Sequence, residues 1–183
     1  MFNLIEEKQI PLLDVKARLF KDSKFNCQHL HFESKNDEKV FMVAFKTVPE
    51  DSTGIAHILE HTALCGSKKY PVRDPFFMML RRSLNTFMNA FTSSDWTAYP
   101  FATQNDKDFK NLLNVYTDAA FFPNLNRLDF YQEGHRLEFD ENNELQIKGV
   151  VFNEMKGAMS SASAQLWHGM TKHLYPDTTY QFN

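Results

Sequence analysis

The sequence predicts an α+β fold in which a mixed, largely antiparallel sheet packs against helices. Two patterns lead to this prediction. Before residue 50, apolar and polar side chains alternate over short segments, which is typical of half-buried strands. After residue 50, apolar side chains recur at helical spacing in several segments. Strands and helices do not alternate as regularly as they do in a doubly wound parallel sheet.

The segments before residue 50 are expected to be strands, over 15–21, 27–33 and 39–48. Asp22–Ser23 lies between the first two, and Asn36–Asp37 follows the second. Such residues favour turns. Consecutive strands with short connections predict an antiparallel meander.

Later segments have the features of helices. Capping residues at 51–54 precede an apolar repeat at helical spacing, and Gly66 is suited to end that helix. Pro75 suits the first turn of the next helix. The expected helices cover 55–66, 76–91, 106–120 and 127–136, and a last helix runs from Asn153 towards His168. The expected strands among them cover 92–101 and 145–152.

Composition excludes several classes of partner. The chain has 183 residues and a formal net charge of −3, so we expect no nucleic acid and no membrane surface as a partner. The first residues, MFNLIEEKQIPLL, contain no basic cluster before an apolar run, unlike a signal or transit peptide. We therefore expect a cytoplasmic protein, or one of an organellar matrix if the source is eukaryotic. Cys27 and Cys65 are too few for a disulfide framework and are expected to be reduced.

The segment His57-Ile58-Leu59-Glu60-His61 carries the most informative chemistry. On a helix, residues four apart differ in direction by about 40°, so both imidazoles project from one face. That spacing suits two nitrogen ligands on one Zn²⁺. Glu60 lies on the same face and can accept a proton from a water whose pKa the zinc lowers to about 7. The order HxxEH is the inverse of the HExxH motif and has the same mechanics.

A catalytic zinc site needs a third protein ligand and leaves a fourth position for water. Glu154 has one point in its favour, because it follows the apolar segment GVVF and begins an expected helix, so its direction would be fixed at a rigid junction. Spacing alone leaves the other candidates open: Cys65, Glu133, His135, Glu138, His168 and His173.

Three segments together resemble the N-terminal part of a known family. In order along the chain they are GIAHILEHTALCGSKKYPVRDPF, SLNTFMNAFT and KGVVFNEMKGAMSS. They are similar to the pitrilysin/insulysin family of inverted-motif zinc metallopeptidases, and most similar to its presequence-protease branch. The resemblance implies the fold of the first domain of the processing-peptidase-like metallohydrolases. Residues 1–183 would then be one incomplete N-terminal zinc-binding domain, because family members continue with further domains.

The resemblance also implies roles for individual residues. His57, His61 and Glu154 would bind one zinc ion per chain, and Glu60 would be the general base. His135 stands where the branch is expected to have a tryptophan. Two further groups would contact the peptide. One is a segment that would lie beside the bound peptide: Asn89, Ala90, Phe91 and Thr92. The other is an apolar pocket next to the metal: Leu64, Phe76, Phe77 and Leu80.

The implied function is hydrolysis of short, unstructured peptides by a zinc endopeptidase. In the family, a second half of the molecule grips the peptide and closes the chamber in which the peptide is hydrolysed. A chain of this length alone is therefore expected to bind zinc but to hydrolyse peptides poorly, because positioning contributes much of the rate. Its partners would be peptide substrates and the missing C-terminal remainder. We expect the peptide to add as a strand along 92–101.

Two alternatives belong to other functional classes. A degenerate family member could serve as a non-catalytic binding or assembly subunit, but such members lose part of the ligand set, which is complete here. Zinc-dependent ribosylhomocysteine lyases also carry a His-x-x-Glu-His helix, but they take a downstream cysteine as the third ligand. No cysteine follows Cys65 in this sequence.

Overall fold

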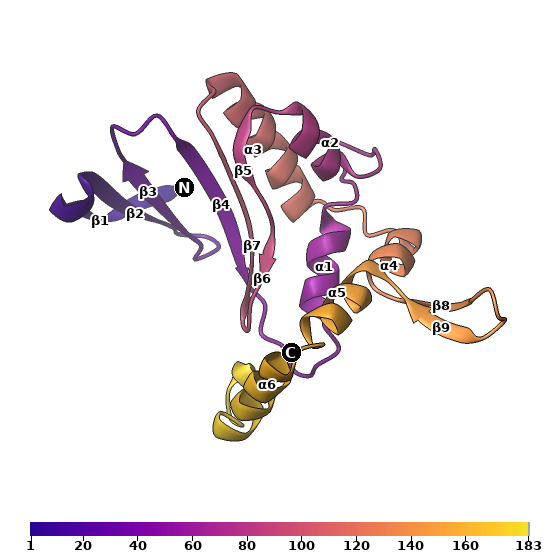
Figure 1. The fold of residues 1–183 in the computed structure, drawn as a ribbon. Helices are drawn as coiled ribbons and strands as arrows, with labels where there is room; N and C mark the ends of the chain where they lie inside the picture. Colours follow the sequence, from indigo (N-terminus) through magenta and orange to yellow (C-terminus); the bar gives the residue numbers. More distant parts are fainter. Residues whose placement is uncertain (183) are drawn as a thin grey trace. The chain divides into compact units, whose positions relative to one another are not determined.

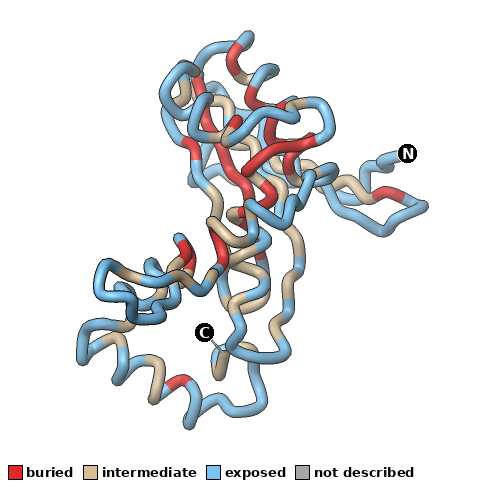
Figure 2. The backbone as a smooth tube through the Cα atoms, turned by 90° about the vertical axis from the view of Figure 1, so that its right-hand side faces the viewer, coloured by how far each residue is buried: buried red, intermediate tan, exposed pale blue. Residues whose placement is uncertain are grey.

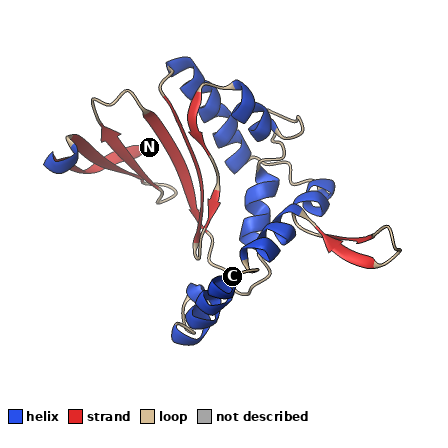
Figure 3. Ribbon diagram, viewed as in Figure 1, coloured by secondary structure: helices blue, strands red, loops and turns tan. Residues whose placement is uncertain are grey.

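The computed structural model describes residues 1–182, which fold into two compact units, residues 1–38 and residue 39 onward. Strands and helices are mixed (Figures 1 and 3), and every named strand pairing in the described part of the chain is antiparallel. The predicted α+β class is therefore confirmed. Among the helices of residues 1–182, none combines the length and the apolar character that a membrane crossing requires.

The first unit is a three-stranded sheet in the order β1-β2-β3. Its elements are β1 (Phe2–Ile10), the 3₁₀ turn η1 (Pro11–Leu13), β2 (Val15–Asp22) and β3 (Gln28–Glu33). The strands predicted at 15–21 and 27–33 are confirmed. The residue pattern does not predict β1, because a register shift between Leu4 and Glu6 breaks the two-residue alternation of its side chains.

The second unit is built on a four-stranded sheet with β7 (Trp96–Thr103) inside it. On one side β7 pairs with β4 (Lys39–Lys46), and on the other it pairs with β5 (Asn85–Met88) and β6 (Phe91–Thr92). The predicted meander is wrong for its third strand, since β4 belongs to this second sheet and takes β7 as its partner.

Helices α1 (Ile55–Ala63), α2 (Pro75–Arg82) and α3 (Asp106–Phe121) lie on one side of this sheet (Figure 1). The core forms where α3 packs on β4 and β7, and Phe101, Leu112 and Tyr116 are fully buried there. Figure 2 shows the buried residues gathered mainly in one region, and most of them come from β7 and α3. This packed layer is the rigid base on which the candidate site stands.

The remaining elements follow α3 along the chain. They are α4 (Arg127–Glu133), the hairpin of β8 (Arg136–Phe139) and β9 (Leu145–Lys148), α5 (Val150–Ala158), α6 (Ala162–Leu174) and the 3₁₀ turn η2 (Thr179–Gln181). Two of these helices, α4 and α5, contact α1 and carry acidic residues towards it.

The predicted helix over 76–91 is wrong beyond Arg82. Ser83 takes an extended backbone conformation, and the residues after it pair with β7, so that Met88 lies opposite Phe101. Tertiary pairing overrides local helical spacing here. The predicted strand over 92–101 shifts to Trp96–Thr103, because Thr92 ends β6 and residues 93–95 form the turn that joins β6 to β7.

Other predicted boundaries also change. The predicted helix over 127–136 ends at Glu133, and the strand predicted over 145–152 ends at Lys148. The helix predicted from Asn153 towards His168 is two helices, because Ser161 caps α6 by accepting a hydrogen bond from the Ala164 amide.

Phe101→Ala tests the assignment of the core. The Phe101 ring is fully buried and packs against Phe41, Phe109 and Tyr116, with ring centroids 5.0–5.4 Å apart. The cavity should lower the free energy of unfolding by about 3–5 kcal/mol. Phe139→Ala, at a ring that is 64% exposed, should lower it by much less. Urea denaturation of both variants checks this, and equal losses would contradict the assignment.

Candidate metal and catalytic site

Helix α1 places three of the predicted site residues on one face. It begins after Gly54, whose φ of 73° is in the left-handed region that favours glycine. The imidazoles of His57 and His61 lie with ring centroids 5.0 Å apart, and both side chains are largely buried. Glu60 is only 6% exposed, although it is an acidic residue. A buried carboxylate requires hydrogen-bond partners, which points to a built site rather than to a solvated helix face.

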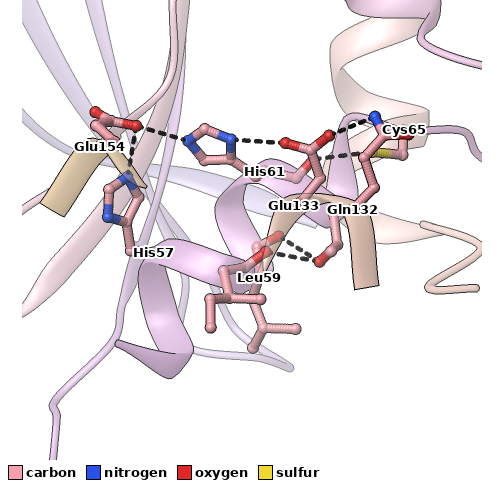
Figure 4. A network of polar contacts seen from close by, with 9 residues as sticks. His57, Leu59, His61, Cys65, Gln132, Glu133 and Glu154 are labelled. Atoms are coloured by element: carbon pink, nitrogen blue, oxygen red, sulfur yellow. Dashed lines mark hydrogen bonds and ion pairs between the residues drawn. The ribbon is translucent and has the colours of Figure 1, made fainter. Parts of the chain in front are cut away.

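Glu154 reaches the two histidines from α5 (Figure 4). Its Oε2 lies 3.8 Å from His57 Nε2 and 3.7 Å from His61 Nε2. One ligand atom from each of the three residues lies within 4.8 Å of the others. In a tetrahedral zinc site, ligand atoms are roughly 3.3–3.5 Å apart. Two imidazole nitrogens and one carboxylate oxygen at this spacing could therefore hold a metal ion.

Glu154 does not begin its helix, as was predicted, but lies in the second turn of α5. The helix starts earlier, at Val150, directly after Gly149, where the chain passes very close to Gly134. A Cβ atom at Gly149 would lie 1.9 Å from the Gly134 carbonyl oxygen. This contact ties the end of α4 to the start of α5 and brings the acidic residues of both helices to α1.

Glu133, from α4, approaches His61 on the other side of its ring. Its Oε2 lies 3.1 Å from His61 Nδ1, and its other oxygen accepts a 2.9 Å hydrogen bond from Gln132 Nε2. Arg73 in turn donates to the Gln132 side-chain oxygen. The hydrogen bond raises the pKa of His61 and lowers that of Glu133. With Nδ1 as the donor, His61 presents Nε2 towards Glu154.

None of the other third-ligand candidates in residues 1–182 belongs to the group of three. Burial raises the pKa of the Cys65 thiol to about 12, and its sulfur donates to the His61 carbonyl oxygen at 3.5 Å. His135 is exposed and packs against Phe130. The three remaining candidates lie on other elements. Glu138 lies on β8, and His168 and His173 lie on α6.

A cavity of about 490 Å³ opens beside these side chains. One part of its lining is polar and includes His57, Glu60 and Glu154. Every residue that was predicted to contact the peptide also lines it: Leu64, Phe76, Phe77, Leu80, Asn89, Ala90, Phe91 and Thr92. Two further lining residues, Asp74 and Met88, carry no signal in the sequence that would mark them as part of a site. The cavity thus joins a candidate metal group to an apolar surface.

The position of the free sheet edge corrects one prediction. Residues 92–101 were expected to offer an edge to a peptide, but β7 is paired on both sides. The outer edge near the cavity belongs to β5 and β6 instead, and it has no strand partner among residues 1–182. At this edge, the Tyr116 hydroxyl donates to the Asn89 carbonyl oxygen, and the Asn89 main-chain amide donates to the Pro100 carbonyl oxygen.

Comparison with known proteins agrees with this geometry. Residues 47–164 match the sequence profile of the family described as Insulinase (Peptidase family M16). The chain is 52% identical to a protein of Xenopus tropicalis named mitochondrial presequence protease, over 98% of this chain and 18% of that protein. It is 48% identical to the protein of the same name from Schizosaccharomyces pombe, over 100% of this chain and 19% of that protein.

The fold has a relative among solved structures as well. The crystal structure of pitrilysin matches with a TM-score of 0.73 at 17% sequence identity, over 98% of this chain and 18% of that chain. The chain therefore spans about a fifth of the length of the proteins it matches. The profile match covers more than half of the chain and confirms the resemblance that the three sequence segments indicate. This chain belongs to the insulinase family, peptidase family M16.

Proposed function

We propose that this chain is the metal-binding part of a zinc-dependent endopeptidase that hydrolyses short, unfolded peptides. One observation carries the proposal, which is that the ligand atoms of His57, His61 and Glu154 converge beside the buried Glu60 in a cavity with an apolar wall. The names of the relatives, which describe presequence proteases, support the same class of reaction.

In this proposal, His57 Nε2, His61 Nε2 and Glu154 Oε2 hold one Zn²⁺ per chain. The donor set fits that ion, because two histidines and one glutamate form the protein ligands of known zinc peptidases and leave a position open. When bound, zinc acts as a Lewis acid that lowers the pKa of water and polarises a peptide carbonyl group. The Glu133 carboxylate keeps the proton of His61 on Nδ1, so that Nε2 is the ligand atom.

Glu60 acts as the general base in this proposal. Its Oε2 accepts a 2.5 Å hydrogen bond from Thr92 Oγ1, so Oε1 is the oxygen available to accept a proton from water in the cavity. The same carboxyl group can then donate that proton to the leaving amine. Glu60 contributes no atom to the group of possible metal ligands, so its carboxylate is available for proton transfer.

The peptide is proposed to bind as an added strand along the edge formed by β5 and β6. Main-chain hydrogen bonds at a sheet edge recognise an extended peptide without reading its sequence, which suits a broad range of substrates. Asn89 and Ala90 lie at this edge and also line the cavity. The apolar wall, which includes Phe76 and Phe77, would take a bulky apolar side chain of the peptide.

The relatives support a proposal on location and partners. Their names place them in mitochondria, which favours the organellar matrix over the cytoplasm for this protein. Because the chain covers 18% of such a relative, we propose the rest of the longer protein as its main partner. A purely binding role has no specific support, since His57, Glu60, His61 and Glu154 are all present.

Glu60→Gln tests the catalytic role in the full-length protein. The amide cannot accept a proton, so kcat on an unstructured fluorogenic peptide should fall by about 10²–10⁴-fold. Bound zinc, measured by mass spectrometry of the metal, should stay at one ion per chain. Glu138→Gln, at an ion-paired carboxylate on β8, should leave both values unchanged. Near-normal hydrolysis by Glu60→Gln would refute the role.

Glu133→Gln tests how the second histidine is held. The variant replaces the carboxylate beside His61 Nδ1 by an amide of the same shape. The affinity for zinc should weaken by about 10–100-fold, which a competition titration against a chelator measures. Glu138→Gln again serves as the control. An unchanged dissociation constant for zinc in Glu133→Gln would show that Glu133 does not orient the ligand.

A further inference from the structure

We infer that the hydroxyl groups of Thr92, Thr97 and Thr47 form a one-way hydrogen-bond chain that positions the Glu60 carboxylate for proton transfer. This inference rests on the proposed role of Glu60 as the general base. It concerns three positioning residues, two of which touch neither Glu60 nor any of the possible metal ligands.

The three hydroxyls form a continuous series that ends at Glu60. Thr92 Oγ1 lies 2.5 Å from Glu60 Oε2, and 3.2 Å from Thr97 Oγ1. Thr97 Oγ1 lies 2.9 Å from Thr47 Oγ1. Thr97, the middle member, is 3% exposed, whereas Thr47 is half-buried. The series therefore runs from the buried Glu60 carboxylate, through the buried Thr97, to the less buried Thr47.

The strand register brings these hydroxyls together. Thr92 on β6 lies directly opposite Thr97 on β7, so both side chains point to the same face of the sheet. Phe45 on β4 lies opposite Thr97 from the other side, and Thr47 comes two residues later, on the same face. Helix α1 contacts β6 and β7 and brings Glu60 to the threonines.

The direction of every hydrogen bond in the series follows from its first member, in which Thr92 donates its single proton to Glu60 Oε2. Thr92 can then only accept from Thr97. Thr97 has now used its own proton and can only accept from Thr47. All three protons therefore point towards Glu60, and no other hydroxyl arrangement keeps the three contacts.

This arrangement fixes which oxygen of Glu60 is free. The hydroxyls take the place of the water that a carboxylate 6% exposed would otherwise need. Hydrogen bonds in a chain polarise one another, which strengthens the bond to Oε2. The carboxyl group is thereby prevented from rotating, which leaves Oε1 as the oxygen available to the cavity that Glu60 lines. Threonine pairs across strands also stabilise sheets in general, so the test must separate kinetic from structural effects.

Thr97→Val in the full-length protein tests the inference. Valine has nearly the same shape but lacks the hydroxyl, so Thr92 no longer accepts a hydrogen bond from residue 97. We expect kcat to fall by about three- to tenfold, the effect of one hydrogen bond, with KM and one bound zinc per chain unchanged. Thr97→Ser keeps a hydroxyl and should restore most of kcat. Thr103→Val removes an equally buried hydroxyl from the same strand, one that donates to Leu84, and should not change kcat.

Coupling to Glu60 provides the second readout. In the Glu60→Gln background, Thr97→Val should cause no further loss of the residual rate, because both changes act on the same step. If Thr97→Val does not fold, Thr47→Val at the half-buried end of the series should lower kcat in the same way but by less. An unchanged kcat in these variants, or an equal loss in both backgrounds, would overturn the inference. Near-normal hydrolysis by Glu60→Gln would instead overturn the proposed function.

Discussion

Burial of the Glu60 carboxylate where α1 packs on β6 and β7 is the constraint on which the rest of the site depends. A charge that is 6% exposed requires partners that replace water. The fold supplies them from a different part of the chain, through Thr92 and the strand pairing behind it. Because α1 is a regular helix, fixing Glu60 also fixes the directions of His57 and His61 on the same face. The packing of α1 on the sheet thus sets three candidate site residues at once.

The opposite wall of the site depends on a second close contact. Gly149 lies so close to Gly134 that no side chain would fit at that position. This contact holds the end of α4 beside the start of α5, and each helix then directs one glutamate towards His61, Glu133 at Nδ1 and Glu154 at Nε2. The two acidic residues therefore act on different nitrogens of one ring. Together with the apolar wall, this arrangement explains how a chain about a fifth as long as its relatives can bring three candidate metal ligands together.

Local patterns predicted those parts of the fold and the site that depend on local geometry. Helical spacing was enough to place His57, Glu60 and His61 on one face, because a helix fixes residues four apart. Spacing left the third ligand open, since Glu154 comes from a distant helix, and only the family resemblance selected it. The prediction of one helix over 76–91 is wrong beyond Arg82 for a related reason, because the pairing of β5 with β7 is a tertiary interaction. The threonine series combines three segments through strand register, and no pattern in the sequence signals it.

The central claim is that His57, His61 and Glu154 form one metal site. Metal analysis of the purified protein tests it most directly, by comparing the natural sequence with His57→Ala after equal exposure to zinc. His173→Ala, on α6 and outside the group of ligands, is the matched control. The account predicts one zinc ion per chain in the natural sequence and in the control, and loss of stoichiometric zinc in His57→Ala. Unchanged zinc in His57→Ala would contradict it.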